Sequence, residues 1–225
     1  MRLLWAFGYK LSMRMKTNIK YFTKTIRVVY NKFMELQILE WINVNLHGSS
    51  FFNNLIAILS SMADKGLIWI IVGLCLVYFK KTRPAGFTLL ISLALGWVLN
   101  DFIIKEIVAR PRPFTESPEL LQFLNTLNIG LPDSYSFPSG HSFASLNCSV
   151  VLMCFYGKKA WPALTFGIII ALSRCFLCVH YPTDVLVGSI LGVGFALAAY
   201  FVGYKIIWPK IFTWWNNRKI KKVSK

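Results

Sequence analysis

Charged residues are scarce in this sequence, and acidic residues are the scarcest. Of its 225 residues only 15% are charged and 56% are hydrophobic, whereas a soluble globular domain carries about 25% charged residues. The nine Asp and Glu residues stand against 25 Lys and Arg, and they form no cluster that could hold magnesium. The composition therefore favours a membrane protein, and the length suits a single domain.

Cysteine is also sparse. The five cysteines lie inside apolar runs, where Cys behaves as a small hydrophobic residue, and their spacing indicates no disulfide framework. Cys175 and Cys178 have the Cys-x-x-Cys spacing, but no second pair of Cys or His accompanies them. We therefore rank a metal or redox role for this pair below a packing role. The sequence shows no internal repeat or low-complexity segment.

Positive charge is concentrated at the two ends of the chain. The first 34 residues hold eight Lys or Arg and no acid, which predicts a basic amphipathic segment at the membrane interface. A poorly ordered leader, or an early start codon, is the alternative for residues 1–34. No signal peptide is evident, because the apolar run Leu3–Phe7 is too short and no small-residue cleavage site follows it. We expect a membrane-embedded domain at residues 35–209 and a basic cytoplasmic tail at residues 210–225.

Long apolar runs fill the middle of the chain and predict an all-α, polytopic membrane bundle of about six helices. Residues 35–61 are the most polar of these stretches and fit either one transmembrane helix or two shorter helices. We expect the other helices at residues 67–79 (with an extension from residue 60), 85–108, 142–156, 160–179 and 185–204. Pro111 and Pro113 end the second of these, and a polar loop follows at residues 114–136.

Three polar motifs interrupt the apolar runs. Lys105–Pro113 has the pattern Lys-x6-Arg-Pro, Pro138–His141 is Pro-Ser-Gly-His, and Ser173–Asp184 has the pattern Ser-Arg-x5-His-x3-Asp. Placing one Arg or Asp at the centre of a bilayer costs about 2.5–3.5 kcal/mol. A chain that keeps several such residues beside apolar helices is therefore expected to use them in its function.

Together the three motifs resemble those of the type 2 phosphatidic acid phosphatase family, integral membrane lipid phosphatases related to the vanadium haloperoxidases. All three match without a substitution and in the same order, and the resemblance covers roughly residues 35–205. It implies a phosphatase that needs no metal or other cofactor. It also implies a set of site residues: the catalytic members are His180, His141 and Asp184, and the phosphate-binding members are Lys105, Arg112, Ser139, Gly140 and Arg174.

The chemistry of these residue types supports the same roles. Phosphate-ester hydrolysis needs a nucleophile, a proton for the leaving oxygen and positive charge around the phosphoryl oxygens. His180 can attack and form a phosphohistidine, and Asp184, four residues later, can accept the proton of the other ring nitrogen. His141 is the candidate general acid. It follows Ser139 and Gly140 at a predicted helix start, where free N–H groups favour an anion.

The basic motif residues would hold the non-bridging oxygens of the phosphate. Lys105, Arg112 and Arg174 supply the positive charge, and Arg offers a planar fork that matches phosphate. Arg174 could instead form an ion pair with Asp101 or Asp184. Lys105 could instead be a snorkelling lysine at a helix end.

Other polar residues near the motifs have simpler explanations. Ser139 could cap a helix rather than donate its hydroxyl to phosphate. Arg110 lies outside the matched motif positions, and we expect it to be a charge at the rim of the site. His47 is the one histidine outside the motifs, and we expect it to be solvated or to pack against neighbours.

The distribution of basic residues predicts the orientation in the membrane. A soluble protein with a net charge of +16 would suggest a nucleic acid partner, but here the basic residues flank apolar segments. With six spans, 20 of the 25 Lys and Arg fall on the side of the two termini. The positive-inside rule then places both termini in the cytoplasm and the three motifs on the outer face. We expect the bilayer and a membrane lipid as partners, and no nucleic acid.

The protein is therefore expected to be a lipid phosphate or diphosphate phosphatase at the outer surface of the cell membrane. In bacterial relatives such a site serves undecaprenyl diphosphate, the carrier of wall glycans, which is the favoured substrate. Phosphatidic acid or phosphatidylglycerol phosphate is the alternative, and a lipid phosphotransferase would use a hydroxyl acceptor in place of water. The complete motifs disfavour a non-enzymatic lipid binder or transporter, and the predicted spans disfavour a haloperoxidase.

Overall fold

The computed structural model describes residues 32–127, 130–207 and 209. The predicted basic N-terminal segment and the predicted basic tail lie almost entirely outside these residues. The chain divides into two compact units, Met1–Ile38 and Leu39–Lys225, and the described residues of the first unit belong to helix α2, Lys32–Leu46. The described residues form helices and irregular segments with no strand, so the predicted all-α class is confirmed.

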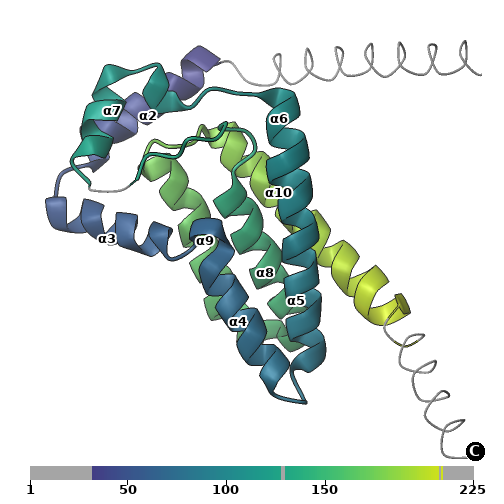
Figure 1. The fold of residues 1–225 in the computed structure, drawn as a ribbon. Coiled ribbons are helices and arrows are strands. Elements are labelled where there is room, and N and C mark those ends of the chain that lie inside the picture. Colours follow the sequence, from purple (N-terminus) through teal and green to yellow (C-terminus); the bar gives the residue numbers. More distant parts are fainter. Residues whose placement is uncertain (1–31, 128–129, 208, 210–225) are drawn as a thin grey trace, which may run out of the picture. The chain divides into compact units, whose positions relative to one another are not determined.

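The second unit continues as a series of helices joined by turns and loops (Figure 1). The main α-helices are α3 (Ser50–Ser61), α4 (Leu67–Tyr78), α5 (Arg83–Trp97), α7 (Pro118–Asn125), α8 (Gly140–Tyr156), α9 (Trp161–Phe176) and α10 (Pro182–Ala198). The remaining elements are the 3-10 turns η1 (Asp64–Gly66), η3 (Pro113–Thr115) and η4 (Gly157–Ala160), the short α-helix α6 (Lys105–Val108), and the π-helices η2 (Val98–Ile104) and η5 (Ala199–Ile207). Proline stands in the first turn of α5, α7, α9 and α10, where its missing N–H leaves no hydrogen bond unmade.

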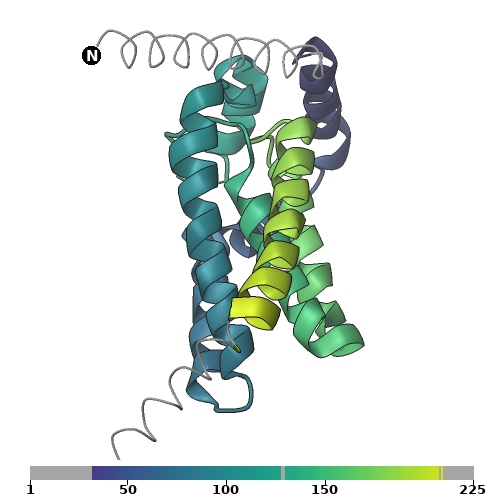
Figure 2. The same ribbon diagram turned by 90° about the vertical axis from the view of Figure 1, so that its right-hand side faces the viewer.

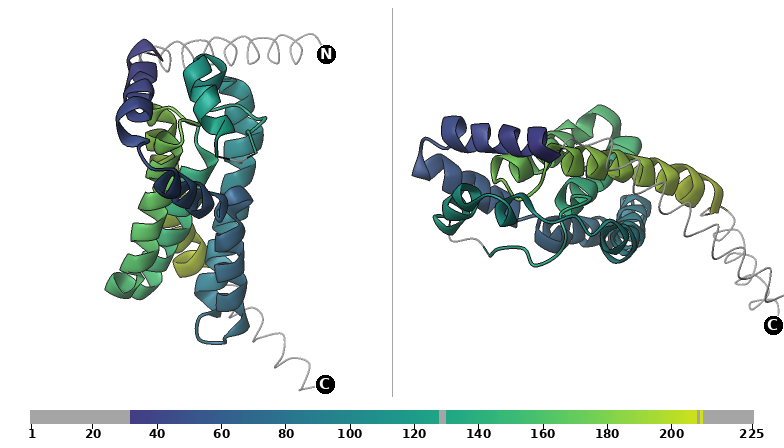
Figure 3. Two further views of the ribbon diagram at one scale, coloured as in Figure 1. Left: turned by 90° about the vertical axis from the view of Figure 1, so that its left-hand side faces the viewer. Right: turned by 90° about the horizontal axis from the view of Figure 1, so that it is seen from above.

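Helix α8 is the centre of the bundle in this unit. It packs against α10, α9 and α5, while α4 packs on α5 and α3 contacts α9 (Figure 3). Helix α5 and the η5 extension of α10 also pack against each other (Figure 2). A buried apolar cluster joins Trp69 of α4 and Leu89 of α5 to Cys148 and Val151 of α8. The long helices therefore share one core around α8.

Two glycines allow α10 to approach α8 closely. A Cβ on Gly188 would lie 2.5 Å from the carbonyl oxygen of Ser139, and one on Gly192 would lie 2.4 Å from a backbone oxygen of α8. Small residues favour such close approach between membrane helices, because lipid is as apolar as a leucine and tight packing must hold the helices together. This contact fixes the start of α10, which carries Asp184, beside the start of α8, which carries His141.

Several helices are long and apolar enough to cross a membrane. Among the described residues three stretches meet this requirement: Arg83–Thr115, Gly140–Phe176 and Pro182–Ile206. The pair Ser50–Ser61 and Asp64–Tyr78, bent by 43°, makes a fourth if it forms one span. The second stretch contains both α8 and α9, which are joined by η4 and pack against each other. The number of six spans stays a prediction.

The surface of these helices is apolar. Large side chains that a soluble protein would bury are more than half exposed, among them Leu95, Phe102, Leu172 and Ile190, as expected where lipid rather than water surrounds the helices. The polar stretch at residues 35–61 forms two shorter helices, α2 and α3, with three non-helical residues between them. This is the second of the two arrangements predicted for it.

Candidate active site

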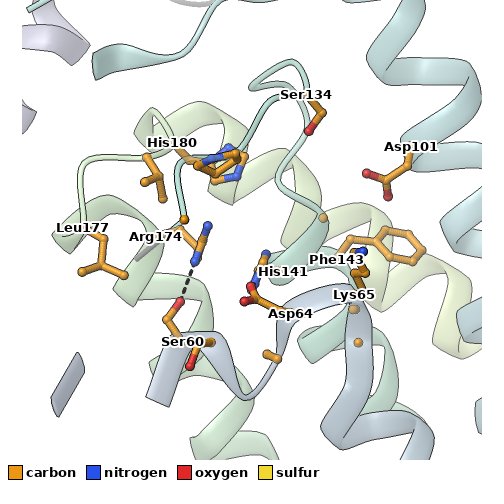
Figure 4. Close-up of a pocket in the computed structure, with 18 of the residues that line it drawn as sticks. Ser60, Asp64, Lys65, Asp101, Ser134, His141, Phe143, Arg174, Leu177 and His180 are labelled. Atoms are coloured by element: carbon orange, nitrogen blue, oxygen red, sulfur yellow. Dashed lines mark hydrogen bonds and ion pairs between the residues drawn. The ribbon is translucent and has the colours of Figure 1, made fainter. Parts of the chain in front are cut away.

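A cavity of about 1130 Å³ collects residues from all three motifs. Six of the eight predicted site residues line it: Lys105, Arg112, Gly140, His141, Arg174 and His180. The other two, Ser139 and Asp184, are fully buried. Figure 4 shows His180, Arg174 and His141 around the cavity, with residues of α3 and η1 beside them. Segments that are distant in the sequence are thus brought to one place.

The ring of His180 meets the carboxylate of Asp184. His180 lies in the turn between α9 and α10, and its Nδ1 atom is 3.6 Å from Asp184 Oδ2 and 3.5 Å from the hydroxyl oxygen of Ser136. Asp184 stands in the first turn of α10, where its Oδ2 accepts the backbone N–H of Tyr181 at 2.9 Å and the hydroxyl of Ser136. Free N–H groups and the helix dipole stabilise a carboxylate at this position, so the helix start itself holds Asp184 beside His180.

The other ring nitrogen of His180 faces the cavity. Nε2 lies 3.3 Å from Nη1 of Arg112, a contact in which the guanidinium can only donate. The contacts therefore fit a neutral imidazole with its proton on Nδ1 and a lone pair on Nε2. Burial, the largest cause, and then the cations Arg112 and Arg174 lower the pKa of His180 well below its ordinary value. This lowered pKa favours the neutral imidazole, which is the form that can act as a nucleophile.

Two arginines are held at the cavity wall by fixed hydrogen bonds. Arg112 is 5% exposed and donates to three backbone carbonyl oxygens of neighbouring loops, at 2.7, 3.0 and 3.3 Å. Arg174, at the end of α9, donates from Nη1 to the hydroxyl of Ser60 at 2.6 Å, and its buried Nε has no hydrogen-bond partner among the residues described. Within that part of the chain no ion pair joins Arg174 to Asp101 or Asp184, which was the alternative prediction.

Lys105 is buried and paired with a carboxylate. The residue is 5% exposed, and its ammonium group donates to Asp101, one turn earlier. Asp101 belongs to the π-helix η2, a conformation often found at functional sites. The burial of Lys105 argues against a snorkelling role, because a snorkelling head group reaches water. Since Asp101 lines the same cavity, an anion bound there would compete with it for Lys105.

His141 stands in the first turn of α8 and bonds a carboxylate from another helix. Its Nε2 is 2.8 Å from Asp64 Oδ1. Lys65 and Gly66 have left-handed backbone, with φ of 51° and 73°, and the turn that they form within η1, directly before α4, presents Asp64 to the cavity. Ser139 caps α8, because its Oγ accepts the backbone N–H and the hydroxyl of the residue three positions later, at 3.4 and 2.9 Å. The capping role of Ser139 is confirmed, and its contact with phosphate stays a prediction.

Sequence reasoning missed several polar residues that hold the motif residues in place. The hydrogen-bonded pairs are Asp64 with His141, Ser136 with Asp184, and Ser60 with Arg174. The prediction that Arg110 is a rim charge is wrong, because the residue is 2% exposed and forms an ion pair with Asp184. None of these residues stands at a matched motif position. The one available signal was the position of Arg110 two residues before Arg112.

Residues outside the motifs have packing roles. His47 stacks on the ring of Phe123 at a centroid distance of 3.6 Å, and its Nε2 lies 2.7 Å from the carbonyl oxygen of Phe176, as the packing interpretation expects. Cys178 is buried and Cys175 is partly buried. In the part of the chain that the structure describes, no three His, Cys, Asp or Glu residues gather in a way that could hold a metal ion.

Comparison with known proteins finds similarity in both sequence and fold. Residues 85–208, which contain all three motifs, match the model of the PAP2 superfamily. The chain is 32% identical over 152 residues to an undecaprenyl-diphosphatase of Sulfolobus acidocaldarius, covering 66% of this chain and 69% of the relative. It is 28% identical over 150 residues to the undecaprenyl-diphosphatase BcrC of Bacillus subtilis, covering 65% and 74%.

A solved structure has a similar fold. The crystal structure of the first transmembrane PAP2 type phosphatidylglycerolphosphate phosphatase from Bacillus subtilis aligns with a TM-score of 0.63. The alignment covers 84% of this chain and 96% of that one, at 21% sequence identity. At this identity the similarity shows the shared fold alone.

Proposed function

We propose a substrate and a mechanism for this chain, which belongs to the PAP2 superfamily and is a membrane phosphatase. It hydrolyses undecaprenyl diphosphate to the monophosphate through a phosphohistidine on His180. The observation that carries this proposal is the position of the His180 ring. Its Nδ1 faces the buried carboxylate of Asp184, and its Nε2 faces a cavity lined by Lys105, Arg112 and Arg174. An imidazole oriented in this way can attack a phosphorus atom whose oxygens are held by cations.

In the first step Nε2 of His180 attacks the terminal phosphorus, and the bond from phosphorus to the bridging oxygen breaks. The proton on Nδ1 stays on the ring and points to Asp184, whose carboxylate stabilises the positive charge that develops on the ring. Arg112 and Arg174 hold the non-bridging oxygens. Hydrogen bonds to the protein fix their guanidinium groups in place before the substrate binds, and such preorganised donors are an effective form of electrostatic catalysis. Lys105 joins them when the phosphate displaces its carboxylate partner.

His141 supplies and then removes the protons. Its Nε2 bonds Asp64 at 2.8 Å, and the leaving oxygen of the substrate takes the place of this carboxylate and receives a proton from the ring. In the second step His141 accepts a proton from a water molecule, whose oxygen attacks the phosphohistidine. Inorganic phosphate leaves, and the neutral ring of His180 is restored.

The apolar part of the cavity suits a lipid chain. Apolar residues of α3, α4 and α5 line it beside the polar end, among them Ile58, Ile70, Leu90, Leu93 and Trp97. Ile58 and Trp97 are 61% and 50% exposed, so this wall continues onto the outer surface of the helices. A polyprenyl chain can therefore remain in the lipid while its phosphate meets the nucleophile.

Six spans with both termini in the cytoplasm are part of the same proposal. It is supported by the separate helices α8 and α9 and by the excess of basic residues on one side. A membrane-impermeant thiol reagent applied to intact cells tests it in a background without native cysteines. Thr126→Cys should be labelled and Ser224→Cys should be spared. The reverse pattern would overturn an outward-facing site.

Phosphate release by purified protein tests the substrate. A panel in detergent micelles with EDTA should contain undecaprenyl diphosphate, undecaprenyl phosphate, phosphatidic acid and phosphatidylglycerol phosphate at equal mole fractions. We expect the highest kcat/KM with undecaprenyl diphosphate. A higher kcat/KM with phosphatidylglycerol phosphate would show that this lipid, and not undecaprenyl diphosphate, is the preferred substrate. A phosphorylated lipid acceptor beside free phosphate would indicate a phosphotransferase. No release from any lipid by folded protein would overturn the proposed function.

A further inference from the structure

Arg110 is buried at the back of the site, although it stands at none of the matched motif positions. The residue is 2% exposed and is not among the residues that line the cavity. Its Nη1 donates to Asp184 Oδ1 at 2.5 Å and to the hydroxyl of Thr183 at 2.9 Å. Its guanidinium carbon lies 3.7 Å from the ring centroid of Tyr181. The side chain thus contacts three of the four residues that follow His180.

The local backbone explains how Arg110 reaches this position. Ala109 ends α6 in the left-handed region, with φ of 47°, so the chain turns away from the helix axis immediately before Arg110. The carbonyl oxygen of Arg110 then accepts the backbone N–H of Ser136 at 2.8 Å. Ser136 is the residue whose hydroxyl donates to Asp184. Arg110 therefore holds Asp184 with its side chain and holds a second donor to Asp184 with its backbone.

The two arginines of this segment act on opposite sides of His180. Arg112 lies 3.3 Å from Nε2, the nitrogen that faces the cavity. Arg110 contacts the carboxylate that faces Nδ1. Asp184 is fully buried, and a buried carboxylate stays ionised only where charges and hydrogen bonds compensate for the lost water. A guanidinium bonded to one oxygen leaves the other oxygen turned to His180.

We propose that Arg110 is a positioning residue of the phosphatase: it holds Asp184 ionised and oriented so that Asp184 can fix the proton of His180 on Nδ1. The proposal rests on the function proposed above. Arg110 acts through Asp184 and does not hold the phosphate. Its removal should therefore lower kcat and leave KM nearly unchanged, because the ground-state contacts of the phosphate remain.

Kinetics of single and double variants test this role. Loss of a residue that orients a functional side chain typically costs about 10–100-fold in activity, and we expect Arg110→Met to lose kcat by that factor. The double variant with Asp184→Asn should lose no more than Asp184→Asn alone, because the two residues act as one unit. Arg83→Met, at an exposed arginine that begins α5, is the matched control and should keep the wild-type kcat. If the double variant lost kcat by the product of the two single losses, the proposal would be overturned. A raised KM with normal kcat in Arg110→Met would also overturn it.

A second variant covers the case in which Arg110→Met does not fold. Arg110→Lys keeps the charge but cannot bond Asp184 and Thr183 from a planar fork. We expect a smaller loss of kcat than for methionine, again at unchanged KM. Wild-type kcat in Arg110→Lys together with a raised KM would show that Arg110 binds substrate.

The proton state of His180 tests the role of Arg110 without any turnover, so its outcome is separate from that of the lipid panel. The charged groups that face His180 are Asp184 on one side and Arg112, Arg174, His141 and Lys105 on the other. Nitrogen NMR of histidine-labelled protein should find His180 protonated on Nδ1. In Arg110→Met its titration should move to higher pH, because the uncompensated carboxylate favours the imidazolium form. An unchanged titration in a folded variant would overturn the proposal.

Discussion

Replacing Arg174 with lysine tests whether the guanidinium fork, and not only its charge, is required. In the structure Nη1 is bonded to Ser60 at 2.6 Å, and the buried Nε has no partner among the described residues. The remaining N–H groups are thus available for two phosphate oxygens. A lysine has one ammonium group, which cannot stay on Ser60 and also hold two oxygens in a fixed plane. Loss of one preorganised donor costs about 10²–10³ in rate, or about 2.7–4 kcal/mol of transition-state stabilisation, and we expect Arg174→Lys to lose kcat by this factor.

The assay is steady-state phosphate release from undecaprenyl diphosphate in micelles, with kcat and KM measured separately. Arg83→Lys is the matched control, because Arg83 is exposed at the start of α5 and its Nε donates to a local carbonyl oxygen, that of Val77, at 3.0 Å. Thermal unfolding of both variants shows whether a loss of activity reflects a loss of folded protein. Near-normal kcat in a folded Arg174→Lys variant would show that Arg174 is mainly structural, and it would refute the reasoning from the fork.

Three further predictions follow from the same site. His180→Ala should abolish turnover while keeping the fold and lipid binding, and phosphate release by the folded variant would remove His180 as the nucleophile. His141→Ala should slow hydrolysis of a lipid phosphate far more than that of an aryl phosphate, since an acidic leaving oxygen needs less protonation; equal losses would contradict the role of His141 as general acid. Because the pKa of His180 is lowered from its ordinary 6.5, the neutral nucleophile persists as the pH falls, and kcat/KM should be retained below pH 6.5. An acid limb with an apparent pKa at or above 6.5 would contradict this.

The contact between the two proposed catalytic residues, His180 and Asp184, could be predicted from the sequence because its geometry is local. His180 and Asp184 are four residues apart, and the proline at the first position of α10 marks the helix start between them. A carboxylate in the first helical turn is held by the backbone N–H groups, so its place beside the preceding turn follows from the chain itself. The structure has this contact, at 3.6 Å.

The supporting residues could not be predicted because their partners are distant in the sequence. Asp64 lies 77 positions from His141, and Ser136 lies 48 positions from Asp184. A single sequence carries no signal for such pairs, which depend on how helices pack. Arg110 was misjudged for a related reason: its direction depends on the left-handed backbone of Ala109 (φ of 47°), a conformation that an alanine seldom adopts.

The most direct test of the central claim is to trap the phosphoenzyme. His141→Ala should accumulate it from an aryl phosphate labelled with ³²P, because the first step then needs little acid while the second still lacks its base. Alkaline quenching on the millisecond scale, followed by digestion, should place base-stable, acid-labile label on the peptide that contains His180, and the double variant with His180→Ala should carry none. Label on another residue, or turnover of the aryl phosphate by His141→Ala without any labelled protein, would contradict a phosphohistidine on His180.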